Sequence, residues 1–331
     1  MSAKMDPQDP ASFTHKFSRV NGIRYHYVDE GTGPVLFLCH GFPDLWFGWR
    51  YQIPYLVKKG YRVIVPDLRG FGDTDSPKAA PGDDEALKQY GFKNLCKDMA
   101  ELLDHVAGKG SKATFIGHDW GAALVWRMCL WYPERVLNVA AICVPYAPPN
   151  DEFVSIEQLV KLRPQFKYQI WFKQPSTDAV LDAHTSLILR SVYRGAGEMS
   201  LIVMPSIDKL PKDIRLSPKL KMSPKDMEYY VQQYKKSGFH GPLNFYRTRK
   251  INFEDEKGLP KDLKLNAMLV YASDDPAFPE KQIKTTSPNI KNFETHRVEA
   301  GHFVQVEGTD HLNAILGDWL DRAYSSKQSK L

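Results

Sequence analysis

The chain has 331 residues, of which 43% are hydrophobic and 25% charged, and its formal net charge is +5. These proportions exclude a disordered, collagen-like or coiled-coil protein and predict a globular core large enough to carry a second lobe. Because the most basic stretch, residues 209–236, is interleaved with aspartates and glutamates, we expect a solvated face there and no nucleic-acid partner.

The four cysteines are scattered through apolar segments, and none belongs to a Cys-x-x-Cys pair. We therefore expect reduced, buried thiols and neither a disulfide framework nor a zinc site. The polar first ten residues and the lack of any apolar run of about 18 residues predict no secretory signal and no stable membrane insertion.

The last three residues are Ser329-Lys330-Leu331. A carboxyl-terminal Ser-Lys-Leu is an address read by the peroxisomal import receptor. We therefore expect that receptor as a partner and a peroxisomal location, with an additional cytoplasmic pool left open.

Short apolar runs alternate with segments of helical periodicity along most of the chain. Buried strands that alternate with helices predict an α/β fold with a mostly parallel central sheet flanked by helices. The predicted strands are 23–28, 35–39, 61–65, 113–116, 136–144, 267–271 and 293–298, and the predicted helices are 94–106, 121–131 and 311–324.

Residues 145–241 depart from this alternation. Helix-like segments at 156–172, 178–193 and 224–236 dominate there and prolines punctuate them, which predicts an inserted helical cap. The resulting division of the chain is an N-terminal extension (1–17), a discontinuous core (18–144 and 242–324), the cap (145–241) and a flexible C-terminal tail (325–331).

A nucleophile elbow is predicted at Gly117-His118-Asp119-Trp120-Gly121, between a strand and a helix. The small flanking residues allow the sharp turn that exposes the central side chain. Here that side chain is a carboxylate, which can displace a leaving group from an sp3 carbon and form an alkyl ester. An isolated Gly-x-Asp-x-Gly would more commonly cap the helix, so this interpretation depends on the residues that accompany it.

Two further residues complete a candidate triad in the expected chain order. His302, which follows the strand at 293–298, is the candidate general base, and Asp275, which follows the strand at 267–271, is the acid that orients it. The neighbouring Asp274 competes for that role, although the position of Pro279 favours Asp275.

The tetrapeptide His40-Gly41-Phe42-Pro43 follows the strand at 35–39. The backbone N–H groups of Phe42 and Trp120 are candidates for an oxyanion hole. We expect His40 to brace this loop, and the same sequence is compatible with a tight turn at a cis proline.

Together, the segments at 40–43, 117–122 and 301–303 resemble those of the epoxide hydrolases of the α/β-hydrolase fold, the group that includes the soluble enzymes. Two cap segments, 167–172 and 237–247, resemble those that carry the ring-opening tyrosines, which would be Tyr168 and Tyr246. Two phenols suit this role because an epoxide oxygen gains negative charge as its C–O bond breaks.

The resemblance implies that Asp119 attacks the epoxide and that His302 activates water against the resulting ester, which releases a vicinal diol. The implied reaction requires only the epoxide and water, with no metal and no organic cofactor. The phosphatase domain of the mammalian soluble enzymes has no counterpart in the sequence, so no phosphatase activity is expected.

Two other functions stay open. A haloalkane or haloacid dehalogenase would share Asp119 and His302, and the indole of Trp120 would suit a halide as well. An alternative of another class is a non-catalytic ligand-binding protein on the same fold. The oligomeric state, monomer or homodimer, is equally open.

The predicted pocket is apolar and suits lipid-derived or aromatic epoxides. The substrate-binding candidates are Trp120, Trp171, Phe245 and Phe303, with Phe172, Leu187, Ile188, Tyr193 and Met204 as further pocket residues.

Overall fold

A computed structural model of the chain describes residues 5–194, 214–218, 220–283 and 288–328. The candidate pocket residue Met204 and the terminal Ser329-Lys330-Leu331 lie outside these residues. None of the helices within the described ranges is both long and apolar enough to cross a membrane.

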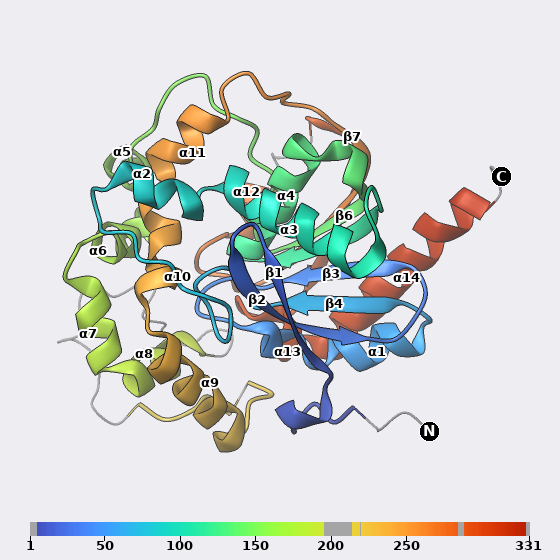
Figure 1. Cartoon of the computed structure of the whole chain (residues 1–331), viewed down its shortest axis with the longest axis horizontal. Coiled ribbons are helices and arrows are strands. Elements are labelled where there is room, and N and C mark those ends of the chain that lie inside the picture. Colours follow the sequence, from blue (N-terminus) through green and yellow to red (C-terminus); the bar gives the residue numbers. More distant parts are fainter. Residues whose placement is uncertain (1–4, 195–213, 219, 284–287, 329–331) are drawn as a thin grey trace.

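One sheet of eight strands occupies the centre of the molecule (Figure 1), in the order β1-β2-β4-β3-β5-β6-β7-β8. The pairs β1–β2 and β2–β4 are antiparallel, and all the other pairs are parallel. The predicted mostly parallel sheet is therefore confirmed. The strands are β1 (His15–Val20), β2 (Ile23–Glu30), β3 (Val35–Cys39), β4 (Arg62–Pro66), β5 (Ala113–His118), β6 (Val136–Ile142), β7 (Leu263–Ala272) and β8 (Ile290–Val298).

Helices cover both faces of this sheet, with α3 and α4 on one side and α1 and α14 on the other (Figure 1). All six residues of β5 are buried, as expected for a parallel strand with helices on both faces. The helices are α1 (Gln52–Lys58), α2 (Asp84–Leu87), α3 (Phe92–Ala107), α4 (Trp120–Trp131), α5 (Ile156–Leu162), α6 (Tyr168–Phe172), α7 (Thr177–Ala183), α8 (Thr185–Val192), α9 (Pro224–Ser237), α10 (His240–Asn244), α11 (Arg249–Asp255), α12 (Glu280–Ile283), α13 (Val304–Glu307) and α14 (Thr309–Gln328).

The segment from α5 to α10 lies beyond one end of the sheet, on the left in Figure 1. The helix predicted over 156–172 is broken, because α5 ends at Leu162 and a short 3₁₀ helix starts at Pro164. A proline has no N–H to continue an α-helix and disfavours helical geometry in the residue before it. The helix predicted over 178–193 is likewise divided into α7 and α8, which meet at His184.

The first strand was not predicted from the sequence, and it crosses the predicted boundary between the extension and the core. It is the edge strand of the sheet, and of its six residues only Val20 is buried. Because an edge strand buries so little, its sequence lacks the apolar run that identified β3 and β5.

Candidate active site

The nucleophile elbow has the backbone geometry expected from its sequence. Asp119 stands between β5 and α4 with φ 52° and ψ −120°, a conformation that a residue with a side chain rarely adopts. A Cβ atom on Gly117 would lie 2.2 Å from the carbonyl oxygen of Gly121, and one on Gly121 would lie 2.1 Å from that of Cys39. The turn therefore requires glycine on both sides of Asp119.

The carboxylate of Asp119 is held from two directions. Its Oδ1 accepts a hydrogen bond of 2.7 Å from the Phe42 N–H, and its Oδ2 lies 3.7 Å from Nε2 of His302. Burial favours the neutral acid, yet the nearby His302 and the hydrogen bond from the Phe42 N–H keep the pKa of Asp119 below its ordinary value. Asp119 is therefore ionised and available as a nucleophile.

The structure brings Asp275, rather than Asp274, against His302. Nδ1 of His302 donates to Oδ2 of Asp275 over 2.8 Å, whereas Asp274 is exposed. The other oxygen of Asp275 accepts from the backbone N–H groups of Ala277 and Phe278, at 2.8 and 3.2 Å. These bonds fix the carboxylate that orients the imidazole.

The charge of His302 is set by the two carboxylates beside it. Burial alone would lower its pKa, but the negative charge of Asp275, the nearby carboxylate of Asp119 and the hydrogen bond to Asp275 raise the pKa well above its ordinary value. The raised pKa favours the imidazolium form of His302 while Asp119 is ionised.

His40 braces the loop that carries Phe42, as predicted. Nδ1 of His40 bonds the carbonyl of Gly41 at 2.9 Å, and its Nε2 accepts from the Leu68 N–H at 2.9 Å. The Phe42–Pro43 peptide bond is cis. The second proposed oxyanion donor, the N–H of Trp120, belongs to the first residue of α4.

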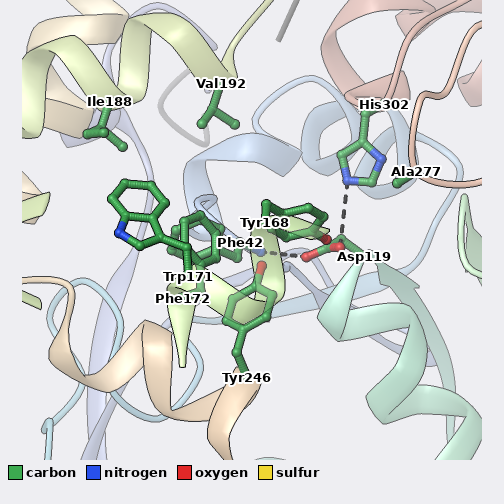
Figure 2. A pocket seen from close by; sticks show the side chains of 10 residues that line it. All are labelled: Phe42, Asp119, Tyr168, Trp171, Phe172, Ile188, Val192, Tyr246, Ala277 and His302. Atoms are coloured by element: carbon green, nitrogen blue, oxygen red, sulfur yellow. Dashed lines mark hydrogen bonds and ion pairs between the residues drawn. The ribbon is translucent and has the colours of Figure 1, made fainter. Parts of the chain in front are cut away.

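The two candidate tyrosines come from the cap side of the cavity. Tyr168 opens α6, and Tyr246 lies in a 3₁₀ helix, Phe245–Arg247, that follows α10. Figure 2 shows both hydroxyl groups turned toward Asp119. Burial, followed for Tyr168 by the charge of Asp119 and for Tyr246 by Tyr168 and Asp119, raises the pKa of both phenols. Both are therefore protonated and able to donate.

Packing of aromatic rings holds these phenols. The ring of Tyr246 meets those of Trp120 and Phe172 at 5.0 Å each, and that of Phe42 at 5.5 Å. The ring of Tyr168 lies 6.0 Å from that of Tyr246. Sequence reasoning missed Gln169, whose Nε2 donates to the hydroxyl of Tyr168 over 3.3 Å.

The side chains around Asp119 enclose a mainly apolar cavity (Figure 2). Of the pocket candidates, Trp171, Phe172 and Ile188 line it, whereas Trp120 and Phe245 line an adjacent groove. The complete lining is Phe42, Asp119, Tyr168, Trp171, Phe172, Ile188, Val192, Tyr246, Ala277 and His302.

Three other pocket candidates are placed elsewhere. Phe303 and Tyr193 stack on each other at 4.3 Å, and neither they nor Leu187 belong to the lining of the cavity. Val192 and Ala277, which were not predicted, line the cavity instead. Both side chains are small, and nothing in the local sequence pattern distinguishes them from core residues.

One group of side chains in the described ranges has the spacing of metal ligands. The donor atoms of His118, Cys143 and His302 lie within 4.8 Å of one another. However, burial raises the pKa of Cys143 to about 12, so the thiol stays protonated and is a poor metal ligand. Instead, the thiol of Cys143 and Nε2 of His118 bond the carbonyl of His302, at 3.3 and 2.8 Å, and so position its backbone.

Comparison with known proteins agrees with this site. Residues 34–309 match the family model of the alpha/beta hydrolase fold. The chain is 37% identical over 327 residues to bifunctional epoxide hydrolase 2 of Mus musculus, a match that covers 95% of this chain and 56% of the mouse protein. The chain thus spans little more than half the length of the mammalian relatives it matches.

Other relatives match over nearly their whole length. Epoxide hydrolase srdG of Neurospora crassa is 31% identical over 346 residues, which cover 96% of this chain and 98% of the fungal protein. The crystal structure of epoxide hydrolase A from Mycobacterium thermoresistibile superimposes with a TM-score of 0.78 at 31% identity, covering 93% of this chain and 98% of that one. The chain therefore belongs to the alpha/beta hydrolase fold family and, within it, to the epoxide hydrolases.

Proposed function

We propose that this protein hydrolyses epoxides to vicinal diols through a covalent ester on Asp119. The observation that carries the proposal is the position of one ionised carboxylate between a histidine on the core side and two protonated phenols on the cap side. The phenols favour an epoxide over a halide, because a departing alkoxide needs a proton and a halide does not.

In the first step an oxygen of Asp119 attacks one epoxide carbon, and the bond from that carbon to the epoxide oxygen breaks. The phenols of Tyr168 and Tyr246 bind the oxygen as it becomes negative, and one of them gives it a proton. The products are a hydroxyalkyl ester of Asp119 and a tyrosinate. Formation of the ester removes the negative charge of Asp119, so the pKa of His302 falls. The imidazolium then gives its proton to the tyrosinate, which leaves a neutral imidazole to act as the general base.

In the second step His302, oriented by Asp275, takes a proton from water while the oxygen of that water attacks Cγ of the ester. The N–H groups of Phe42 and Trp120 stabilise the oxyanion. Cleavage of the acyl–oxygen bond releases the alkoxide, which takes the proton of the new carboxylic acid to complete the diol. His302 keeps the proton it took from water and is again an imidazolium beside the ionised Asp119, so each cycle consumes one water and one epoxide.

The origin of the oxygen atoms tests this mechanism. A single turnover of trans-stilbene oxide in heavy-oxygen water should place the label in the peptide that contains Asp119 and none in the first diol released, because the first diol takes its new oxygen from Asp119. Label in that first diol would contradict the covalent route and indicate direct attack by water.

The lining of the cavity supports apolar substrates, namely lipid-derived or aromatic epoxides. Its walls include Trp171, Phe172, Ile188 and Val192. Comparison of kcat/KM for trans-stilbene oxide, an epoxy fatty acid and a small polar epoxide such as glycidol tests this preference. The polar epoxide should be the poorest substrate.

The peroxisomal address is also a proposal, because Ser329-Lys330-Leu331 lies outside the described residues and rests on the sequence alone. A fluorescent protein fused ahead of the full chain should accumulate in peroxisomes. Deletion of the last three residues should abolish that accumulation.

A further inference from the structure

We propose a second ligand site behind the two epoxide donors, in which Arg249 binds the carboxylate of a small aromatic acid. The site is a groove next to the cavity of Asp119 and separate from it. Its volume of about 140 Å³ is close to that of an apolar cavity known to take up benzene, about 150 Å³. It is therefore large enough for one aromatic ring.

Six of the fourteen residues that line this groove are aromatic, and six are polar or charged. The aromatic residues include Phe92 at the start of α3, Trp120 at the start of α4, Phe153 in the loop before α5, and Phe253 in α11. Figure 1 locates α11 above α10, and the rings of Phe153 and Phe253 lie 5.5 Å apart. Sites for small organic ligands combine aromatic walls with polar groups that fix the orientation of the ligand.

One cation of the groove has no carboxylate within ion-pair distance among the residues that the structure describes. Arg127 is paired with Glu256 through two hydrogen bonds of 2.9 and 3.0 Å, so these two charges compensate each other. Nε of Arg249 donates to the carbonyl of Val154 over 2.6 Å, and among the described residues no carboxylate lies within ion-pair distance of this guanidinium. Glu157 acts on Arg249 only at longer range and is itself paired with Lys173.

A carboxylate would complete this arrangement. Arginine presents parallel N–H donors that match the two oxygens of a carboxylate, and it stays protonated in proteins. Burial lowers the pKa of Arg249, which agrees with a cation partly removed from water and not compensated. Because Nε of Arg249 donates to the carbonyl of Val154, the terminal amino groups of the guanidinium are the donors available to the carboxylate of the ligand. The ring of the ligand would then lie between the aromatic side chains of the groove.

The groove is in contact with the catalytic donors. It shares Tyr246 with the cavity, and it is also lined by Gln169, which donates to the hydroxyl of Tyr168. Tyr246 lines both spaces, and the ring of Trp120, which lines the groove, lies 5.0 Å from the ring of Tyr246. An acid bound at Arg249 would therefore lie against the back of the residues that bind the epoxide oxygen.

Isothermal titration of the full chain with benzoate and with benzamide tests the site. The two probes have nearly the same shape and differ in charge, and a hydrogen bond to a charged group contributes about ten- to hundredfold in affinity. We expect benzoate to bind at least about tenfold more tightly than benzamide. Equal affinities would overturn the proposal, and this comparison needs no variant.

Two variants assign the preference to Arg249. In Arg249→Met the ratio of the two affinities should fall to less than about twofold, and in Arg249→Lys, which keeps the charge and loses the fork, it should fall to an intermediate value. Lys250→Met is the matched control, because it removes an exposed neighbouring charge that does not line this groove. A benzoate preference that survives in Arg249→Met, or that is lost in Lys250→Met, would overturn the proposal.

The titration contains no epoxide, so its result is independent of the proposed hydrolysis. A chain that hydrolyses epoxides and binds benzoate and benzamide equally would lack the acid site and keep the proposed function. A chain that binds benzoate through Arg249 and hydrolyses no epoxide would have the acid site and lack the proposed function.

Discussion

The two halves of the candidate site are held in place by different forces. On the core side, Asp119, Asp275 and His302 are fixed by hydrogen bonds, several of them to backbone groups. On the cap side, Tyr168 and Tyr246 are held by ring contacts and, for Tyr168, by one bond from Gln169. The core side supplies the nucleophile and the base, whereas either phenol of the cap side can bind the epoxide oxygen. We therefore expect changes on the core side to abolish steps of the reaction and changes on the cap side to slow them.

The largest effect should follow from Asp119→Ala. This variant lacks the nucleophile, and loss of a covalent nucleophile lowers kcat by at least about ten-thousandfold. Steady-state hydrolysis of trans-stilbene oxide measures it, and circular dichroism checks the fold. Residual activity within tenfold of the wild type would contradict the assignment of Asp119.

His302→Gln should separate the two chemical steps. Attack by Asp119 does not need a base, whereas hydrolysis of the ester does, so the variant should accumulate the hydroxyalkyl enzyme and lower kcat by about a thousandfold or more. Intact-protein mass spectrometry should then detect the protein plus the mass of one substrate. An unmodified mass with equally slow turnover would place His302 in the first step instead.

The tyrosines test the cap half. Removal of one preorganised donor to a developing oxyanion costs about a hundred- to a thousandfold, but here each phenol can partly replace the other. We expect Tyr168→Phe and Tyr246→Phe each to slow alkylation of Asp119 less than the double variant does. Stopped-flow measurement of the alkylation step distinguishes them, and a double variant no slower than either single one would show that only one phenol donates.

These unequal constraints also decide how much of the site could be predicted from the sequence. Asp119, Phe42 and His302 stand where a strand ends, so short motifs with glycine reveal them. Gln169 and Val192 act through their place in the cap, and the cap helices are short and broken by residues such as Pro164, which obscures their periodicity. Arg249 was not singled out, because only the folded chain reveals that none of the described carboxylates lies within ion-pair distance of its guanidinium.

The charge of His302 makes a prediction about pH. Its pKa is raised despite burial, chiefly by the charge of Asp275, so the stabilisation of the folded state is complete below about pH 6.5 and is lost as the pH rises through the raised value. In Asp275→Asn much of this stabilisation is absent. We therefore expect the free energy of unfolding of the wild type to fall more steeply between pH 7 and 10 than that of Asp275→Asn, as measured by urea denaturation.

Asp274→Asn is the matched control for this experiment. Asp274 is exposed and Asp275 is buried against the imidazole, so only the second replacement should change the slope. Parallel curves for the wild type and Asp275→Asn would mean that His302 is neutral in the folded protein.

The smallest effect on activity is expected at Asp44, where the core and cap halves of the site are in contact. Asp44, two positions after Phe42 and buried, accepts hydrogen bonds from the hydroxyls of Tyr230 in α9 at 2.7 Å and of Tyr193 at 3.2 Å. A core carboxylate is thereby bonded to two cap phenols. Tyr230→Phe removes one donor from a buried charge, which should lower the free energy of unfolding by about 1–3 kcal/mol and kcat only slightly.

The pH dependence of that loss has a definite sign. Burial raises the pKa of Asp44, and the bond from Tyr230 is among the interactions that lower it, so without Tyr230 the pKa should rise further. A carboxyl group with a raised pKa destabilises the folded state as the pH increases from about 4 to the folded value. Urea denaturation should therefore find the defect of Tyr230→Phe larger at pH 7 than at pH 4, with Tyr271→Phe on strand β7 as a control. If the defect is the same at both pH values, Asp44 is neutral in the folded protein, and the cap and core meet there through an uncharged hydrogen bond.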